Sequence, residues 1–209
     1  MEETIPLFPL KLVAFPGELV NLHIFEPRYI ELIHDVLAGN RRFGIPSFIN
    51  NTIEYGTLME IAEVSKTYED GRMDIRTKGL KVFRVLDYLN PSPDKKYTTG
   101  TVRYIDNHNE QDPYLKSYMV EKLEEFFDCL HFIGKITVNE ETVSYDVVHK
   151  LGLKLEEEYK ILRMNREIDR QEFITDYLDK TIPTLKRAEK AREIIKMNGH
   201  FKYLDPINF

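Results

Sequence analysis

The side chains best suited to metal or covalent chemistry are few in this chain and form no recognisable motif. Its six histidines are scattered along the sequence, at His23, His34, His108, His131, His149 and His200. No two of them have the HExxH spacing that would place both imidazoles on one helix face for zinc. The single cysteine, Cys129, excludes an internal disulfide and any site built from several cysteines. The sequence therefore predicts neither a metal nor a cofactor, and we expect Cys129 to be a packed or partly buried thiol.

Hydrolytic chemistry also lacks its sequence signals. A phosphate-binding loop needs a glycine-rich run that closes on Lys and Ser or Thr, because backbone N–H groups must cradle the phosphates. The nearest run, Gly134-Lys135-Ile136, lacks the upstream glycine and the hydroxyl. None of the serines lies in a nucleophile-elbow pattern. We therefore expect no ATPase or peptidase activity, and an enzyme with an unrecognised site remains an alternative that a deep pocket with convergent titratable groups would favour.

The segment Phe25-Glu26-Pro27-Arg28-Tyr29 is the strongest candidate for a binding site. It has a structural interpretation, in which Pro27 opens a helix and Glu26 provides the negative charge that suits a helix N-terminus. In this interpretation Arg28 pairs with a nearby carboxylate. The functional interpretation places Phe25, Glu26, Arg28 and Tyr29 beside a groove that holds an extended or unfolded peptide. Both interpretations stay open, and together they define these four residues as the candidate peptide- or partner-binding site.

Strands are expected on both sides of this segment. Pro6, Pro9 and Pro16 remove backbone donors from the apolar start of the chain, so we expect an interrupted or edge strand there. Residues 19–25 form a second strand, and a helix that starts at Pro27 should end at Gly39-Asn40. Interrupted strands leave backbone edges that can accept an added strand from a bound peptide.

A β-hairpin is the clearest local prediction. Asp70-Gly71 tolerates the positive φ of a tight turn and joins a strand over residues 57–67 to one that starts at Met73. Gly79 is expected to break the second strand before it resumes at Val82. A last strand is expected over residues 98–105.

The segments that contain these elements resemble a known family. The run PLFPLKLVAFPGELVNLHIFEPRY, residues 6–29, and the run YGTLMEIAEVSKTYEDGRMDIRTKGLKVFRV, residues 55–85, are similar to the N-terminal, substrate-binding domain of the Lon ATP-dependent proteases. The resemblance implies an α+β fold, with a PUA-like β-barrel subdomain followed by a helical-bundle subdomain. It also implies that Gly79 lies between two barrel strands. The stretch 153–162 looks like the one that precedes the long last helix of these domains.

Composition shifts from strand to helix patterns near residue 107. We therefore expect a barrel subdomain over residues 1–107 and a helical subdomain over residues 108–209. Several helices are expected in the second part. One has an apolar stripe from Leu115 to Leu130 and ends at Ile133-Gly134, and two short ones follow at 140–151 and 155–164. A longer helix is capped by Asp169 with Glu172 and is kinked or interrupted at Pro183, and a last stretch ends at Asn198-Gly199.

Charge and hydropathy exclude some classes of partner. The net charge is −6, with 29 Lys and Arg against 35 Asp and Glu and no basic stripe. Nucleic acid is therefore not expected as a partner, although some PUA-like domains bind RNA. No apolar stretch approaches the ~20 residues of a membrane span, and the acidic N-terminus is not a secretory signal. We expect a cytoplasmic protein without a membrane partner.

The function expected from the resemblance is recognition without catalysis. The chain should be a Lon N-terminal-like module that binds protein partners or unfolded peptide segments and lacks the ATPase and peptidase parts. Its expected partners are unfolded substrates or a protease. The alternative is a small-molecule sensor, or an adaptor that acts in trans on a protease or chaperone. The chain has no Trp for an aromatic cage, which counts against the sensor.

Overall fold

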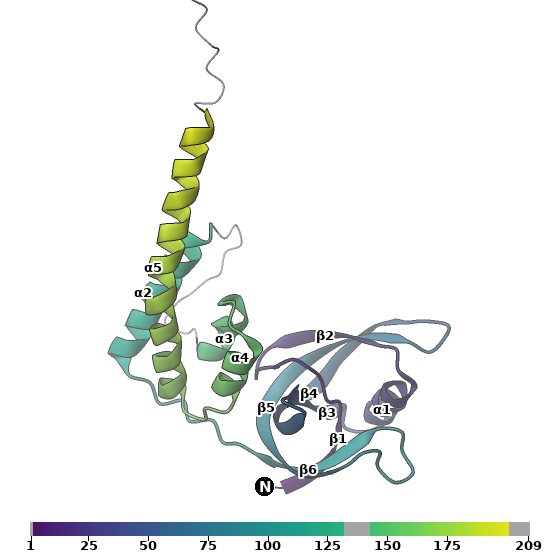
Figure 1. Ribbon diagram of the computed structural model, residues 1–209. Helices are drawn as coiled ribbons and strands as arrows, with labels where there is room; N and C mark the ends of the chain where they lie inside the picture. Colours follow the sequence, from purple (N-terminus) through teal and green to yellow (C-terminus); the bar gives the residue numbers. More distant parts are fainter. Residues whose placement is uncertain (1, 132–142, 201–209) are drawn as a thin grey trace, which may run out of the picture. The chain divides into compact units, whose positions relative to one another are not determined.

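The computed structural model of the protein describes residues 2–131 and 143–200 (Figure 1). The chain divides into two compact units. The first comprises Met1–Asn109 with Val143–Glu167, and the second comprises Glu110–Thr142 with Ile168–Phe209. The first unit contains the strands and the second contains two long helices, so the predicted α+β fold class is confirmed.

The first unit is built on one six-stranded sheet. Its strands are β1 (Glu2–Leu7), β2 (Leu19–Ile24), β3 (Arg42–Ile49), β4 (Thr52–Thr67), β5 (Met73–Leu89) and β6 (Thr98–Tyr104). The strand order is β2-β5-β4-β3-β1-β6, and β5 also pairs with β6. This additional pairing closes five strands into a barrel and leaves β2 outside the ring, beside β5 (Figure 1).

The start of the chain is interrupted as predicted, but it is not an edge. β1 ends at Leu7, and pairing with β3 resumes through the bridge between Leu10 and Ser47. Of the two predicted alternatives, an interrupted or an edge strand, the second does not hold, because β1 lies between β3 and β6 in the strand order. Its pairing with β3 is parallel and is confined to Leu7 opposite Gly44, whereas its pairing with β6 is antiparallel and continuous. Pro6 precedes the contact with β3, so that contact does not need the missing donor.

The predicted hairpin is confirmed, and its glycines have different roles. β4 and β5 join through a turn in which Gly71 has a φ of 86°. Gly79 does not break β5. Leu58 pairs with Lys81 and Met59 pairs with Gly79, so Leu80 is the extra residue of a β-bulge. A Cβ atom at Gly79 would lie 2.1 Å from the carbonyl oxygen of Phe15, so glycine permits a close approach of two backbones.

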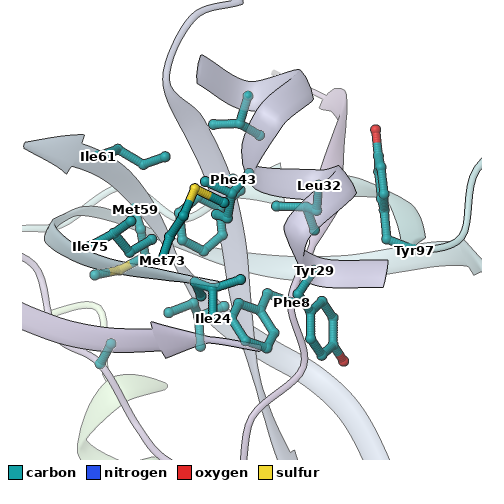
Figure 2. Close-up of a cluster of buried hydrophobic side chains, with 14 residues drawn as sticks. Phe8, Ile24, Tyr29, Leu32, Phe43, Met59, Ile61, Met73, Ile75 and Tyr97 are labelled. Atoms are coloured by element: carbon teal, nitrogen blue, oxygen red, sulfur yellow. The ribbon is translucent and has the colours of Figure 1, made fainter. Parts of the chain in front are cut away.

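The main hydrophobic core lies between helix α1 (Pro27–Ala38) and the sheet. Figure 2 shows its buried side chains, which come from α1, from the strands and from the connecting loops. The helix starts at Pro27 as predicted and contributes Tyr29, Leu32, Ile33 and Val36 to the core. Gly39 follows its last residue, which agrees with the predicted stop.

A short helical stretch belongs to the barrel unit. It contains α3 (Ser144–Val147), the 3-10 helix η1 (Val148–Lys150) and α4 (Leu155–Leu162). This differs from the predicted division at residue 107, which placed all helices after the junction in one subdomain. One physical reason why this stretch belongs with the barrel is the stacking of Tyr145 on Phe15, with ring centroids 5.3 Å apart. A second is a hydrogen bond of 3.2 Å from the backbone N–H of Tyr55 to the Tyr159 hydroxyl.

The second unit contains α2 (Pro113–Cys129) and most of α5 (Glu167–His200). The predicted apolar stripe of α2 is buried at Met119, Leu123, Phe126 and Phe127. Its predicted stop at Ile133-Gly134 lies outside the described residues, as do the first residues of the helix predicted over 140–151. The two helices are joined by a hydrogen bond of 2.9 Å from the Tyr118 hydroxyl to Asp179 and by an ion pair of 2.6 Å between Lys186 and Glu125.

Helix α5 corrects three predictions. It begins at Glu167, so Asp169 is inside the helix and is not its cap. It passes through Pro183 as one helix, so the predicted interruption there is wrong, and it continues to His200 past the predicted stop at Asn198-Gly199. Pro183 is exposed, so the carbonyl that loses its helical partner can be hydrated. Within the described ranges, no helix combines the length and the apolar character needed to cross a bilayer.

Candidate functional site

A cavity of about 310 Å³ opens beside the first turn of α1. Its walls come from α1, from the turn between β3 and β4, from the end of β5 and from the start of β6. The lining residues are Pro9, Arg28, Tyr29, Phe48, Asn51, Ile53, Tyr88, Asn90 and Thr98. Arg28 is the one formally charged residue in this set, and aromatic or aliphatic side chains form much of the wall.

The turn between β3 and β4 places Phe48 at the cavity. Asn50 and Asn51 have φ values of 51° and 61°, a left-handed conformation that asparagine tolerates better than most residues. A register shift between Pro46 and Phe48 marks a bulge in β3. Phe48 is 42% exposed, while Ser47 before it is buried. The bulge and the tight turn thus present an aromatic ring to solvent at the cavity rim.

The opposite wall comes from the end of β5 and the start of β6. Tyr88 is 48% exposed there. The Thr98 hydroxyl, which is buried, donates a hydrogen bond of 2.9 Å to Oδ1 of Asn90. This bond fixes the orientation of the Asn90 amide. The Nδ2 group of Asn90 and the side chain of Asn51 form no hydrogen bond within residues 2–131 and 143–200, so both amides are available to a ligand.

Arg28 is held by two neighbours. Its Nε and Nη2 atoms lie 2.9 and 2.7 Å from the same carboxylate oxygen of Glu26, Oε2. Its guanidinium carbon lies 4.5 Å from the centroid of the Tyr29 ring, the geometry of a cation–π contact. Both members of the ion pair are nearly half exposed, so the pair itself contributes at most about 1 kcal/mol to stability.

Tyr29 forms the floor beneath Arg28. Its ring lies 3.9 Å from the ring of Phe8, centroid to centroid, and Figure 2 shows both rings at the border of the core with the Tyr29 hydroxyl directed away from it. Burial raises the pKa of this hydroxyl, the Arg28 charge lowers it and the Glu26 charge raises it, with a net increase. The hydroxyl therefore stays protonated at neutral pH and can donate a hydrogen bond.

The predicted site residues do not all meet at the cavity. Arg28 and Tyr29 line it, and Glu26 is joined to it through Arg28. Phe25 is 59% exposed and stacks on His23, with ring centroids 5.9 Å apart, so it lies outside the lining set. Sequence reasoning did not find Phe48, Tyr88 or the two amides. The Asn50-Asn51 pair is a turn signal that indicates the hairpin beside Phe48, whereas Tyr88 carries no local signal.

The residues that could bind a metal or react covalently form no second site in the part of the chain that the structure describes. Among residues 2–131 and 143–200, no group of three or more His, Cys, Asp and Glu side chains is arranged to hold a metal ion. Cys129 is half-buried, and desolvation raises the pKa of its thiol. The neutral thiol is therefore favoured, and of the two expected states the half-buried one is found.

Comparison with known proteins gives consistent matches. A family model described as the ATP-dependent protease La (LON) substrate-binding domain matches residues 4–180. The Lon protease of Dictyoglomus thermophilum is 23% identical over 213 residues, which cover 93% of this chain and 26% of that protein. The chain thus spans about a quarter of the length of this curated relative.

Two solved structures share the fold. The Lon N-terminal domain protein from Xanthomonas campestris superimposes with a TM-score of 0.61 at 23% identity, over 81% of this chain and 95% of that one. The N-terminal domain of a Mycobacterium avium complex Lon protease gives a TM-score of 0.64 at 12% identity, over 85% of this chain and 98% of that one. At these identities the structures establish the fold alone, and the family model supplies the assignment. Because its match covers most of the sequence, the chain belongs to the ATP-dependent protease La (LON) substrate-binding domain family.

Proposed function

We propose that this chain is a non-catalytic recognition module that binds extended protein segments, unfolded substrates among them. The cavity beside Arg28 receives one large apolar side chain of the bound segment. The observation that carries this proposal is the pair of exposed aromatic rings, Phe48 and Tyr88, on the cavity wall. Exposed rings around a hollow are typical of surfaces that bind protein chains.

Burial of an apolar anchor supplies the binding energy. Full burial of a Phe or Leu side chain stabilises a complex by about 1.5–3 kcal/mol before the ordering costs are subtracted. Pro9, Ile53 and Phe48 offer apolar contacts to such a side chain, and Tyr88 covers it from β5. A single cavity of this kind gives weak, sequence-tolerant binding, which suits the recognition of many unfolded chains.

The amides of the cavity bind the backbone of the segment. An extended chain carries unpaired N–H and C=O groups, which Asn51 and Asn90 match with both donors and acceptors. Because such contacts do not depend on side-chain identity, they favour an unfolded segment over a folded surface. The aromatic and aliphatic side chains of the wall and the two amides together therefore select an extended chain with one bulky residue.

The test is a fluorescence anisotropy titration with a short rhodamine-labelled peptide that has one Phe in a Gly, Ser and Thr background. We expect Phe48→Ala and Tyr88→Ala each to weaken binding by about tenfold. Tyr114→Ala is the matched control, because Tyr114 is 88% exposed on α2 and does not line the cavity. Wild-type affinity in both cavity variants, with unchanged melting temperatures, would refute the proposal.

A further inference from the structure

We propose that the segment bound at this cavity carries a carboxylate next to its apolar anchor, and that Glu26 occupies the position of that carboxylate in the unbound protein. The inference rests on the proposed function and specifies the chemistry of its ligand. It follows from the charge of the cavity, from the geometry of the Glu26–Arg28 pair and from the support of Arg28 by Tyr29.

The cavity wall has one charged side chain, and its charge is positive. Arg28 is the one charged residue among the nine that line it, and no acidic side chain lies in the first turn of α1. The N-terminal end of a helix favours negative charge, because its macrodipole is positive there. The guanidinium and the helix end thus act on the same side of the cavity, and both favour a carboxylate over an ammonium group.

Glu26 satisfies Arg28 incompletely. One oxygen, Oε2, accepts a hydrogen bond from Nε and lies in ion-pair contact with Nη2, although a guanidinium has five N–H donors. The strongest arrangement of an arginine with a carboxylate uses two parallel bonds to two oxygens. A ligand carboxylate can adopt that arrangement where Glu26, attached two residues away on the same chain, does not. Because exposed pairs contribute little to stability, exchange of Glu26 for a ligand carboxylate has a small cost.

Arg28 keeps its position when Glu26 leaves. Its guanidinium lies 4.5 Å from the centroid of the Tyr29 ring, and Tyr29 is itself fixed by the contact with Phe8. This contact keeps the guanidinium beside the Tyr29 ring, and both residues line the cavity. A charge that is oriented before binding loses less entropy on complex formation, so the cation–π contact favours affinity.

The experiment compares peptides that differ in one group. Labelled peptides carry Phe followed by Asp, by Asn or by Lys, and a second pair ends in Phe with either a free or an amidated C-terminus. We expect the Phe-Asp peptide to bind about fivefold more tightly than the Phe-Asn peptide. The net charge of −6 favours the Lys peptide non-specifically, so a preference for Asp cannot arise from overall charge.

Three variants assign the preference to the site. Glu26→Gln should tighten binding of the Asp peptide by about threefold, because the competing carboxylate is gone. Arg28→Gln should abolish the difference between the Asp and Asn peptides while it preserves the dependence on Phe48. Glu60→Gln is the matched control, since Glu60 pairs with Arg42 at the same side-chain exposures, 48% for the arginine and 40% for the glutamate, as Arg28 and Glu26.

The outcomes separate the two proposals. Equal binding of the Asp and Asn peptides, with Phe48 still required, overturns the carboxylate inference and leaves the proposed function intact. Failure of every peptide to bind the wild-type chain overturns both. A preference for Asp supports the inference with a side chain as the source of the carboxylate. A preference for the free over the amidated C-terminus supports it with the end of a chain as the source.

Discussion

Nε2 of His149 lies 2.8 Å from Oε2 of Glu18, so a histidine of the helical stretch is joined to the loop that precedes β2. Nδ1 of the same ring lies 2.9 Å from Glu158 in α4. Burial by itself lowers the pKa of His149, but its hydrogen bonds to the two carboxylates and their charges outweigh burial and raise the pKa to about 9. The protonated imidazole therefore links α4 and η1 to the barrel at neutral pH.

The first prediction concerns the pH dependence of this link. The pKa of His149 in the folded protein is above the ordinary value of 6.5. The stabilisation that its charge gives to the folded state is therefore complete below pH 6.5 and is lost as pH rises through about 9. His149→Gln should lower the free energy of unfolding by about 1–3 kcal/mol at pH 6 and by less at pH 10. Urea unfolding at both pH values measures this difference.

His131→Gln is the control for this experiment. His131 also pairs with a glutamate, Glu189, at 2.6 Å, but its side chain is 78% exposed, against 33% for His149. We expect little change in unfolding free energy for this variant at either pH. A loss for His149→Gln that is as large at pH 10 as at pH 6 would mean that packing of the ring, rather than its charge, stabilises the unit.

The second prediction concerns Gly79. An alanine Cβ there would meet the carbonyl oxygen of Phe15 at 2.1 Å, which the backbone can relieve only by moving. We expect Gly79→Ala to destabilise the protein by at least about 2 kcal/mol in urea unfolding. Gly71→Ala is the comparison, because its Cβ meets nothing within 4 Å and its φ of 86° alone costs about 1 kcal/mol. Equal losses for both variants would contradict the close-approach argument.

The third prediction concerns a buried carboxylate. Glu167 is 1% exposed and accepts hydrogen bonds from the backbone N–H of Ser144 at 2.8 Å and from its hydroxyl at 2.7 Å. Ser144→Ala removes the hydroxyl and should cost about 1.5–3 kcal/mol, the range for hydrogen bonds to charged groups. Thermal and urea unfolding of this variant beside Ser65→Ala, at an exposed serine of β4, provide the check. A neutral Ser144→Ala would show that Glu167 does not depend on that donor.

The fourth prediction concerns proline in the helices. Pro183 lies inside α5, where it removes one helical hydrogen bond, so Pro183→Ala should raise the stability of the second unit by about 1–3 kcal/mol. Pro113 lies in the first turn of α2, where the missing donor is not needed, and Pro113→Ala should change stability by less than about 0.5 kcal/mol. Far-UV circular dichroism during thermal unfolding measures both. A Pro183→Ala variant that melts earlier would contradict this expectation.

Local chemistry explains which parts of the fold the sequence predicts. The turn at Asp70-Gly71 and the helix start at Pro27 depend on residues that adopt or exclude particular backbone angles, and both are found in the structure. Arg28 and Tyr29 follow directly from that helix start, so sequence reasoning could place them together. The bulge at Leu80 depends on pairing with β4, which no residue of β5 reveals by itself.

Long-range packing explains what the sequence does not predict. Phe48 and Tyr88 reach one cavity because β5 pairs with β6 and closes the barrel, a contact between distant segments. The stretch Val143–Glu167 has the same apolar pattern whether it packs on a helix or on a barrel. Its place with the barrel depends on particular partners, Phe15 and Glu18, that lie far away in the sequence.

The strand that lies outside the ring also affects how the first unit moves. Among the described strands, β2 pairs with β5 alone, so its separation from the sheet breaks one set of hydrogen bonds and leaves the closed ring whole. Opening of a ring member breaks at least two sets, because each ring strand pairs with at least two others. The backbone amides of Leu19–Ile24 should therefore exchange with deuterium sooner than those of β3 or β4. Such a result would mean that β2 opens locally while the ring stays closed.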